Sequence, residues 1–276
     1  MNPEEYERMH ALETDYWWFV GRRALIAQLL KATRPRIHTD APQLVDIGCG
    51  TGANLPMLRE VVGTGGEVFG LDFSPLALQW ARSEGELQDG QIHLSQGDAL
   101  SLPLRDNCAD IVTMLDVLEH LSDDNLALRE VQRILKPGGA LILSVPAYQH
   151  LWSAHDEALH HFRRYEKVGL NRVLKNAGFQ VWRLSFAMSI MPPIAWFWRR
   201  FVLPFADRRP RDAARHSQGA VLPAVPPTIN KMLVRYVGTE GKIIPKRPLR
   251  FGTSLVAVAF APTQDHRKGD RRHSED

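Results

Sequence analysis

The stretch Leu44–Leu55, LVDIGCGTGANL, decides the fold of this chain. It opens with an apolar run that leads into Asp46, and Gly48, Gly50 and Gly52 then occupy alternate positions. This order predicts a buried strand, a tight turn and the start of a helix, because glycine adopts positive φ and lets backbone N–H groups approach a ligand closely. A strand–loop–helix crevice of this kind favours a nucleotide-like ligand.

The acid ahead of the turn distinguishes this loop from a dinucleotide-binding loop. A dinucleotide fingerprint reads G-x-G-x-x-G and places pyrophosphate at the helix N-terminus. The carboxylate of Asp46 would repel a pyrophosphate, whereas it suits a cationic ligand. Taken alone, the loop could equally be a plain structural turn.

Length and composition limit the class of protein. With 276 residues, 44% of them hydrophobic, the chain is predicted to form one large domain or one domain with insertions. A net charge of +3 does not by itself indicate a nucleic-acid partner. Cys49 and Cys108 make no disulfide framework or zinc signature, so we expect reduced thiols in a cytoplasmic protein. The polar N-terminus predicts no signal peptide, and no apolar run reaches the roughly 18 residues that span a bilayer.

Downstream of the glycine loop, predicted strands alternate with predicted helices. We expect strands over 68–71, 92–94, 110–114 and 140–145, with helices over 55–62, 75–83 and 125–135. Ser74 and Pro75 are typical of an N-cap and a first helical position. Further on, a helix over 167–177, a strand over 179–184 and a last strand over 249–261 are predicted. The alternation predicts an α/β fold with a doubly wound parallel sheet and helices on both faces.

A second acid follows the second predicted strand. Asp72 lies about 20 residues after the glycines, where an acid at a strand end accepts both ribose hydroxyls. Phe73, next to it, can stack on adenine. The alternative for Asp72 is an ordinary surface-loop residue.

Five segments occur in an order that resembles class I S-adenosylmethionine (SAM) dependent methyltransferases. They are DIGCGTG at 46–52, GLDFS at 70–74, GDAL at 97–100, DVLEHL at 116–121 and LKPGG at 135–139. The resemblance covers residues 44–145. It implies a Rossmann-like seven-stranded sheet in the order 3-2-1-4-5-7-6, with the last strand antiparallel next to strand six. It also implies SAM as cofactor and S-adenosylhomocysteine as product, at the carboxyl ends of strands one, two and four.

The resemblance also implies which residues contact the cofactor. Asp98 is expected to accept from the adenine amino group, and the backbone N–H of Ala99 to point at the ring. The complete predicted cofactor-binding set is Asp46, Gly48, Gly50, Gly52, Asp72, Phe73, Asp98, Ala99, Asp116, Trp18 and Arg22.

Residues 1–40 carry a run of four aromatic residues, Tyr16 to Phe19, that is too costly to leave in water. Two interpretations stay open. The run packs on the sheet ahead of a helix over 24–31, or residues 1–40 form a helical lid over the cofactor. In the second case Arg22 or Arg23 would pair with a carboxylate, such as that of methionine.

The loop after the fifth strand, LWSAHDEALHHFRRY at 151–165, concentrates His, acidic and Arg residues. Together with WWF–GRR at the N-terminus it resembles a subset of bacterial class I methyltransferases with diverse substrates. We interpret His155 and His160 as candidate catalytic bases, with Asp156 orienting an imidazole. Metal binding by the same three residues and a purely structural loop are the alternatives. Our main prediction contains no metal.

The remaining domain boundaries follow from composition. Residues 41–184 form the predicted SAM-binding core, 249–261 its last strand and 262–276 a disordered tail. The insertion 185–248 is predicted to cap the substrate pocket. Because it opens with Trp and Arg together, a peripheral contact with the inner face of the membrane through 185–215 is the alternative. A helix over 229–237 would turn Met232, Leu233 and Tyr236 to one face.

These observations predict a SAM-dependent methyltransferase that acts on a small or lipid-linked acceptor, with oxygen as the preferred atom. The alternative is a non-catalytic SAM-binding protein that regulates or scaffolds a partner. The clustered His residues favour the enzyme. A nucleic-acid substrate is not expected, because the basic residues are mixed with Trp and Phe and no N/D-P-P-Y/F tetrapeptide follows strand four.

Overall fold

The fold is a seven-stranded sheet with helices on both faces, seen in a computed structural model that describes residues 10–83, 90–190 and 225–263. The strand order is β3-β2-β1-β4-β5-β7-β6. Six strands point in one direction, five of them paired parallel with one another, and β7 (Ser254–Phe260) lies antiparallel between β5 and β6 (Gln180–Ala187). The parallel strands are β1 (Gln43–Ile47), β2 (Glu67–Asp72), β3 (Ile92–Gln96), β4 (Ala109–Leu115) and β5 (Leu135–Pro146). The predicted order and the antiparallel last strand are confirmed.

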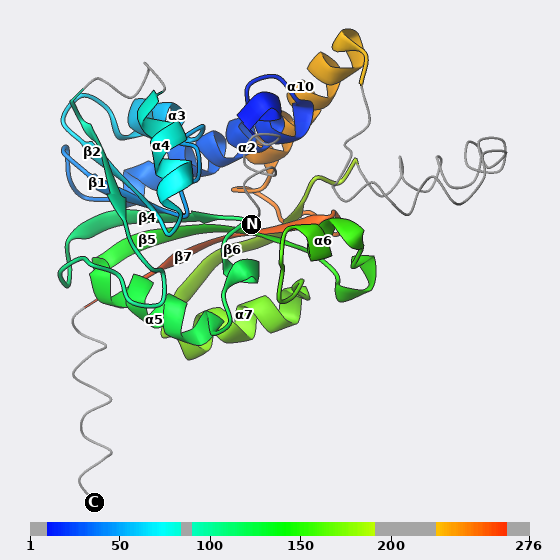
Figure 1. The fold of residues 1–276 in the computed structure, drawn as a ribbon. Helices are drawn as coiled ribbons and strands as arrows, with labels where there is room; N and C mark the ends of the chain where they lie inside the picture. The colour runs from blue at the N-terminus through cyan, green and yellow to red at the C-terminus, as the bar shows by residue number, and fades with distance from the viewer. Residues whose placement is uncertain (1–9, 84–89, 191–224, 264–276) are drawn as a thin grey trace, which may run out of the picture.

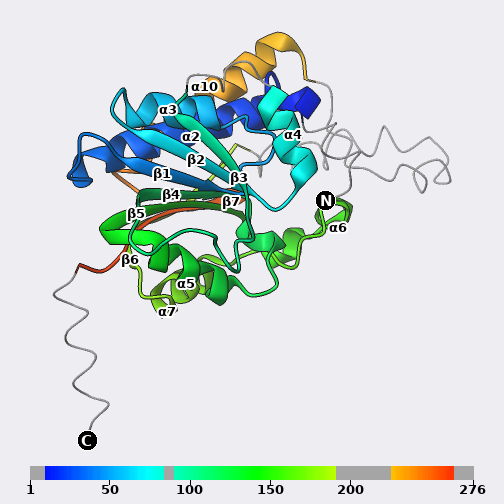
Figure 2. The same ribbon diagram turned by 60° about the vertical axis from the view of Figure 1, so that its left-hand side comes forward.

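Helices cover the two faces of the sheet as separate layers (Figures 1 and 2). One layer holds α2 (Trp17–Thr33), α3 (Leu55–Val62), α4 (Pro75–Ser83) and α10 (Pro227–Ile243). The other holds α5 (Asp124–Ile134) and α7 (Lys167–Asn176), and the short α6 (Ala154–Ala158) lies in the loop between β5 and α7. Each layer packs on its own apolar cluster, so the doubly wound architecture is confirmed.

The strands are apolar on both faces because both faces are covered. All seven residues of β4 are buried. Leu44 of β1 packs in the cluster under α2 and α3, whereas Val45 packs in the cluster under α5 and α7. The continuous apolar runs read from the sequence are therefore strands at the centre of the sheet.

Several element boundaries differ from the prediction, and two of the differences bear on the site and the sheet. The aromatic run begins α2 at Trp17, so one helix replaces the predicted lone helix over 24–31. The predicted break before residue 140 is also wrong, because β5 already begins at Leu135. There the backbone N–H of Gly138 donates to Ala261 (3.2 Å), and Ala261 donates back to Gly139 (2.8 Å). These bonds to the chain beyond β7 hold LKPGG in the strand.

The last helix of the insertion packs directly on α2. A Cβ on Gly241 would lie 2.7 Å from the carbonyl oxygen of Leu25, and one on Gly21 would lie 3.1 Å from Cβ of Val237. Glycines therefore let the two helix backbones approach closely. At the start of α10, Asn230 Oδ1 accepts a hydrogen bond from the backbone N–H of Trp17 (2.8 Å).

The exposed face of α10 differs from the predicted apolar face. Met232 and Tyr236 are 65% and 42% exposed, and the buried residues of α10 are Val237, Glu240 and Gly241. Residues 191–215 of the predicted membrane-contact segment 185–215, and residues 264–276 of the predicted tail 262–276, lie outside the described residues. Among the described helices, none is long and apolar enough to cross a membrane.

Candidate functional site

The glycine loop leads from β1 into α3 and is hydrogen-bonded to the carboxyl end of β2. The φ angles of Gly48, Gly50 and Gly52 are +71°, +58° and +88°. A Cβ on Gly48 would lie 2.4 Å from Cγ2 of Val117, so this position excludes a side chain as well as requiring positive φ. The backbone N–H of Gly48 donates to the carbonyl of Leu71 (2.7 Å), which ties the turn to β2.

Asp72 lies at the end of β2 and faces the glycine loop. Its carboxylate accepts from the backbone N–H of Gly50 and from that of Ser74, both at 2.8 Å. Burial raises the pKa of Asp72, against the lowering effect of these two donors. The adjacent Phe73 is 72% exposed. A fixed carboxylate beside an exposed aromatic ring at this edge fits the ribose and the adenine of SAM.

The end of β3 meets the end of β2 at the same edge. The backbone N–H of Gly97 donates to the carbonyl of Asp72 (3.1 Å). Asp98 is exposed and its Oδ1 accepts from the backbone N–H of Leu100 (2.8 Å), while Ala99 is buried. The structure thus brings Asp98 and Ala99 close to Asp72 at the carboxyl edge of the sheet.

Asp46 is buried near the end of β1 and is only partly satisfied. Its Oδ1 accepts from the hydroxyl of Thr113 at 2.5 Å, but its Oδ2 has no hydrogen-bond partner among the described residues. Burial raises the pKa of Asp46 to about 7, despite the Thr113 hydrogen bond and the charge of Arg22. A cationic ligand at this edge would favour the ionised carboxylate.

Asp116 follows β4 and connects the sheet to α2. Its Oδ1 accepts from the hydroxyl of Ser144 (2.9 Å), and its Oδ2 forms an ion pair with Arg22. Trp18 does not join this pair; it packs edge-on against Trp17, with ring centroids 5.7 Å apart, beside the apolar cluster under α2. Trp18 and Arg22 were both predicted to contact the cofactor. Of these two residues, only Arg22 lies next to Asp116 in the structure.

A further contact with the glycine loop was not predicted. The buried carboxylate of Glu13 accepts a hydrogen bond from the hydroxyl of Thr51. Arg23 donates to the backbone carbonyl of Glu13 at 2.6 Å, which anchors that segment on α2. Glu13 lies in a polar stretch with no motif, so nothing in the local pattern marks it.

The His-rich loop is organised by Asp156, whose side chain is fully buried. Its Oδ1 lies 2.7 Å from Nε of Arg164 and 2.9 Å from Nδ1 of His161, and its Oδ2 accepts from the backbone N–H of Ser153 (2.9 Å). Burial alone would raise the pKa of Asp156, but the donors Arg164 and His161 hold it at about 2. The imidazole that Asp156 orients is therefore that of His161.

The two predicted catalytic histidines lie elsewhere in this loop. His160 is exposed and has a φ of +55°. His155 lies in α6, and its side chain is outside what the structure describes.

A second polar group forms where this loop meets the turn after β4. The 3₁₀ turn η3 (Leu118–His120) places the His120 ring at right angles to that of His161, with centroids 4.5 Å apart and an interplanar angle of 82°. Burial and the neighbouring His161 lower the pKa of His120 to about 4. Glu119 is buried, which raises its pKa well above the usual range, and its Oε2 has no hydrogen-bond partner in the described residues.

These three residues were not predicted as a group. Both motifs that carry them, DVLEHL and HHFRRY, were recognised separately. The two segments are joined by a main-chain hydrogen bond from the N–H of Phe162 to the carbonyl of Glu119 (2.8 Å). A sequence pattern does not reveal such a bond.

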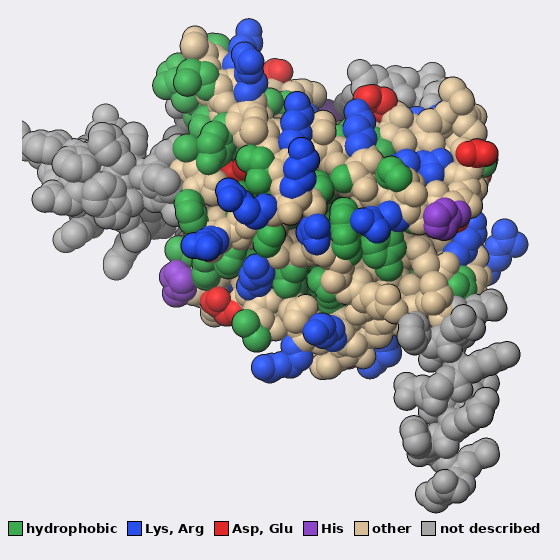
Figure 3. Space-filling model, turned by 180° about the vertical axis from the view of Figure 1, so that it is seen from behind, with side chains coloured by type: hydrophobic (Ala, Val, Ile, Leu, Met, Phe, Trp, Pro, Cys, Tyr) green, Lys and Arg blue, Asp and Glu red, His purple; other side chains and the backbone are tan. Residues whose placement is uncertain are grey.

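The side of the molecule behind Figure 1 carries mainly basic charged side chains. Figure 3 shows Lys and Arg side chains there, separated by hydrophobic and uncharged ones. Arg36 and Arg183 lie over the ring of Trp182, at 4.3 and 4.7 Å from its centroid. This mixed pattern differs from the continuous basic stripe that follows a phosphate backbone.

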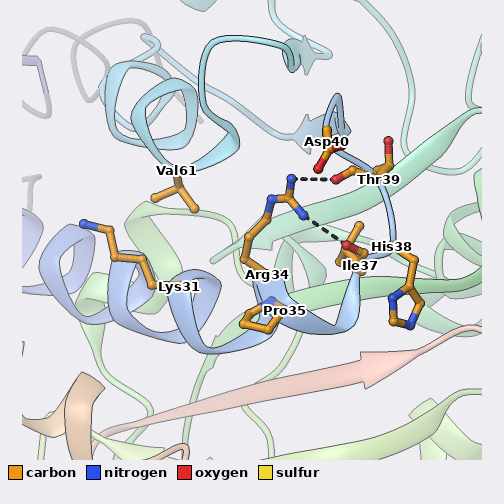
Figure 4. Close-up of a pocket in the computed structure, with 8 residues that line it drawn as sticks. All are labelled: Lys31, Arg34, Pro35, Ile37, His38, Thr39, Asp40 and Val61. Atoms are coloured by element: carbon orange, nitrogen blue, oxygen red, sulfur yellow. Dashed lines mark hydrogen bonds between the residues drawn. The ribbon is translucent and has the colours of Figure 1, made fainter.

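A pocket also lies at the opposite edge of the sheet. Figure 4 shows its lining, drawn from the end of α2, from η1 (Arg34–Arg36) and from the chain leading to β1. Arg34 donates to the carbonyls of Ile37 (3.0 Å) and Thr39 (2.6 Å). The second cation of the lining, Lys31, pairs with Glu60 at 3.5 Å. Because both cations are bound to the protein itself and the pocket is remote from the glycine loop, it is not assigned to the cofactor.

Residues 45–143 match the family model described as "Methyltransferase domain". The matched part is 99 of the 276 residues. Together with the strand order, this match supports a class I SAM-dependent methyltransferase domain in that part of the chain.

Curated relatives match part of the chain. A demethylmenaquinone methyltransferase of Staphylococcus haemolyticus is 41% identical over 98 residues, which cover 36% of this chain and 41% of that protein. A 37.1 kDa protein in transposon TN4556 of Streptomyces fradiae is 32% identical over 161 residues, 56% of this chain and 46% of that protein. The match thus spans about half the length of these relatives or less.

Solved structures share the fold at lower identity. A Haloferax volcanii methyltransferase, in a complex with the Trm112 methyltransferase activator, has a TM-score of 0.60 and 22% identity, with 95% of both chains covered. The [4+2]-cyclase SpnF has a TM-score of 0.54 and 22% identity, with 87% of this chain and 81% of that chain covered. At this identity the likeness shows the fold alone, and the cyclase illustrates that the reaction must be argued from the site.

Proposed function

We propose that the whole protein transfers a methyl group from SAM to a hydroxyl oxygen of a small or lipid-like acceptor. The observation that carries the proposal is the convergence of the glycine loop, Asp72 and Asp116 at one edge of the sheet. Bound SAM supplies an electrophilic methyl group on a positively charged sulfur. The chain must then bind it, orient it and align the acceptor oxygen with the methyl group.

The proposed cofactor contacts divide between two ends of the crevice. Asp72 would accept the ribose hydroxyls, Phe73 would stack on adenine, and Asp98 and Ala99 would contact the edge of the base. At the other end, Arg22 would bind the methionine carboxylate, beside the Asp116 carboxylate that it already neutralises.

The proposed proton acceptor lies in the His-rich loop. His155 and His160 are the candidates, because an imidazole takes a proton from a hydroxyl near neutral pH. Asp156 is engaged by His161, so its proposed role is to hold the loop in place rather than to orient His160. The His155→Ala or His160→Ala variant should lose turnover while it still binds SAM. Unchanged turnover in both single variants would contradict this assignment.

Small-molecule chemistry is supported by the relatives named demethylmenaquinone methyltransferase. A lipid-like acceptor would also agree with a peripheral membrane contact through 185–215, which we propose only as an alternative to a cap over the substrate. Sedimentation with vesicles that contain anionic lipid tests it: salt-sensitive binding supports the membrane contact, and no binding at low salt leaves the cap.

The first experiment is calorimetric titration of the full chain with SAM and with S-adenosylhomocysteine. Micromolar binding of both, lost in Asp72→Ala and kept in Asp40→Ala, would support the proposal. Asp40 is a suitable control because it is an exposed carboxylate at the amino end of β1, remote from the glycine loop. Absence of binding, or equal binding by both variants, would overturn the cofactor site.

The alternative function is a SAM-binding protein that regulates or scaffolds a partner without methylating. Transfer of a radiolabelled methyl group to lipid-linked and aromatic hydroxyls separates the two. Cofactor binding without label transfer to any acceptor would favour the alternative.

A further inference from the structure

We propose that Glu119, His120 and His161 form a binding site for a divalent first-row metal ion of the zinc type. Each residue offers one ligand atom, and these atoms all lie within 4.8 Å of one another. Two imidazoles and one carboxylate are a donor set that zinc and its neighbours accept in sites with an open position. The site differs from the metal alternative considered for the sequence, which involved His155, Asp156 and His160.

The first argument is the unsatisfied carboxylate. Glu119 is only 1% exposed, and its Oε2 has no hydrogen-bond partner among the described residues. A buried oxygen without a partner costs free energy. A cation between Glu119 and the two imidazoles would satisfy this oxygen.

The second argument is the orientation of His161. Its Nδ1 lies 2.9 Å from Oδ1 of the fully buried Asp156, and the imidazole is itself 6% exposed. With Nδ1 held by a carboxylate, Nε2 is the nitrogen left to bind a ligand. A carboxylate behind a histidine is the usual support of a metal-binding imidazole, because it fixes the ring and raises its basicity.

The third argument is that the two contributing segments are firmly joined. Besides the Phe162–Glu119 main-chain bond, Arg163 donates to the carbonyl of Ser122 (2.7 Å) and pairs with Asp124 (3.0 Å). The hydroxyl of Tyr165 donates to the same Asp124 carboxylate (3.0 Å). The three donors are therefore held together before any ion arrives.

A role for the ion rests on the proposed function. Glu119 lies three residues beyond Asp116, on the same loop after β4. An open position on the ion would take the acceptor hydroxyl and lower its pKa, as bound metal does for water. The binding of the ion itself needs neither SAM nor an acceptor, so the two proposals fail separately.

The test uses the full chain, stripped with a chelator and titrated calorimetrically with Zn²⁺ and, in parallel, with Mg²⁺. We expect one Zn²⁺ per chain at micromolar affinity or tighter and much weaker Mg²⁺ binding, because Mg²⁺ prefers oxygen ligands. Substitution of Co²⁺ should give the visible absorption bands of a low-coordinate site. The same sample is titrated with S-adenosylhomocysteine, which reports on the cofactor site independently.

Variants locate the ion. The His161→Ala and Glu119→Gln variants should each lose at least about tenfold in Zn²⁺ affinity, and Asp156→Asn about 10–100-fold through the loss of support. The control is His150→Ala, which removes an exposed imidazole of the neighbouring turn η4 (Gln149–Leu151).

Glu119→Gln keeps the size of the side chain, and circular dichroism checks that each variant is folded. No Zn²⁺ binding by the wild-type chain, or equal affinity in a folded Glu119→Gln or His161→Ala variant, would overturn the proposal.

Discussion

Arg22 of α2 and Asp116 beyond β4 form an ion pair at the carboxyl edge of the sheet. The two side chains are 16% and 26% exposed, so the pair is largely shielded from water. Nε of Arg22 is buried without a hydrogen-bond partner among the described residues. The ion pair thus connects α2 to the sheet at the edge where the glycine loop lies. The Nε–H of Arg22 remains available as a hydrogen-bond donor to a ligand.

Removal of the Arg22 guanidinium should weaken cofactor binding. We expect Arg22→Gln to lower the affinity for S-adenosylhomocysteine about tenfold, because Asp116 is left unpaired and a donor is lost. Arg36→Gln is the control, since Arg36 stacks on Trp182. Calorimetric titration measures both, and equal affinities for the two variants would exclude Arg22 from the site.

Two glycines of the loop should respond differently to the same substitution. Gly48→Ala is expected to lower the free energy of unfolding by about 2–4 kcal/mol, from positive φ and from the clash with Val117. Gly50 also has a positive φ, but no atom lies within 4 Å of the new Cβ in Gly50→Ala. We therefore expect this variant to lower the free energy of unfolding by only about 1–2 kcal/mol. Urea unfolding of both variants tests this order, and a larger loss for Gly50→Ala would refute it.

Burial of Asp46 is expected to make the free energy of unfolding depend on pH. Its pKa rises from 3.8 to about 7 in the folded state, so folding binds a proton between these values and the contribution of Asp46 to stability falls as pH rises through this window. The free energy of unfolding of the ligand-free Asp46→Asn variant, measured relative to wild type, should therefore increase by about 2–3 kcal/mol from pH 5 to pH 8. Parallel pH profiles for wild type and Asp46→Asn would contradict the prediction.

Phe73 should contribute to affinity and not to stability. Because it is 72% exposed, Phe73→Ala should leave the melting temperature unchanged. Loss of a stacked base is worth about 1–3 kcal/mol, so cofactor affinity should fall at least about fivefold. Phe251, which is 53% exposed, supplies the control variant Phe251→Ala. Equal affinities for the two variants would show that Phe73 does not contact adenine.

The order of the sheet and its cofactor edge could be predicted because their signals are local. Asp72 follows an apolar run directly, and the bounds of α3 were predicted to the residue from its position after the glycine loop. Asp98 could be placed only through the family resemblance, since its own surroundings are polar and irregular.

The polar core of the His-rich loop could not be predicted in the same way. His120 and His161 are about 40 positions apart, and their contact depends on main-chain bonds that any residue could make. Asp156 has three histidines within a few positions, and only the fold decides that His161 is its partner. Sequence spacing ranks such choices poorly when the loop is not a regular helix or strand.

The close approach of α10 to α2 limits how the N-terminal helix and the insertion can change independently of each other. Gly241 lies against the backbone of Leu25, and Gly21 lies against the side chain of Val237. The second half of the insertion therefore supports the N-terminal helix and is not an interchangeable module. A chimera that exchanges 185–248 for the insertion of a relative would strip α2 of its neighbour unless both helices were transplanted together.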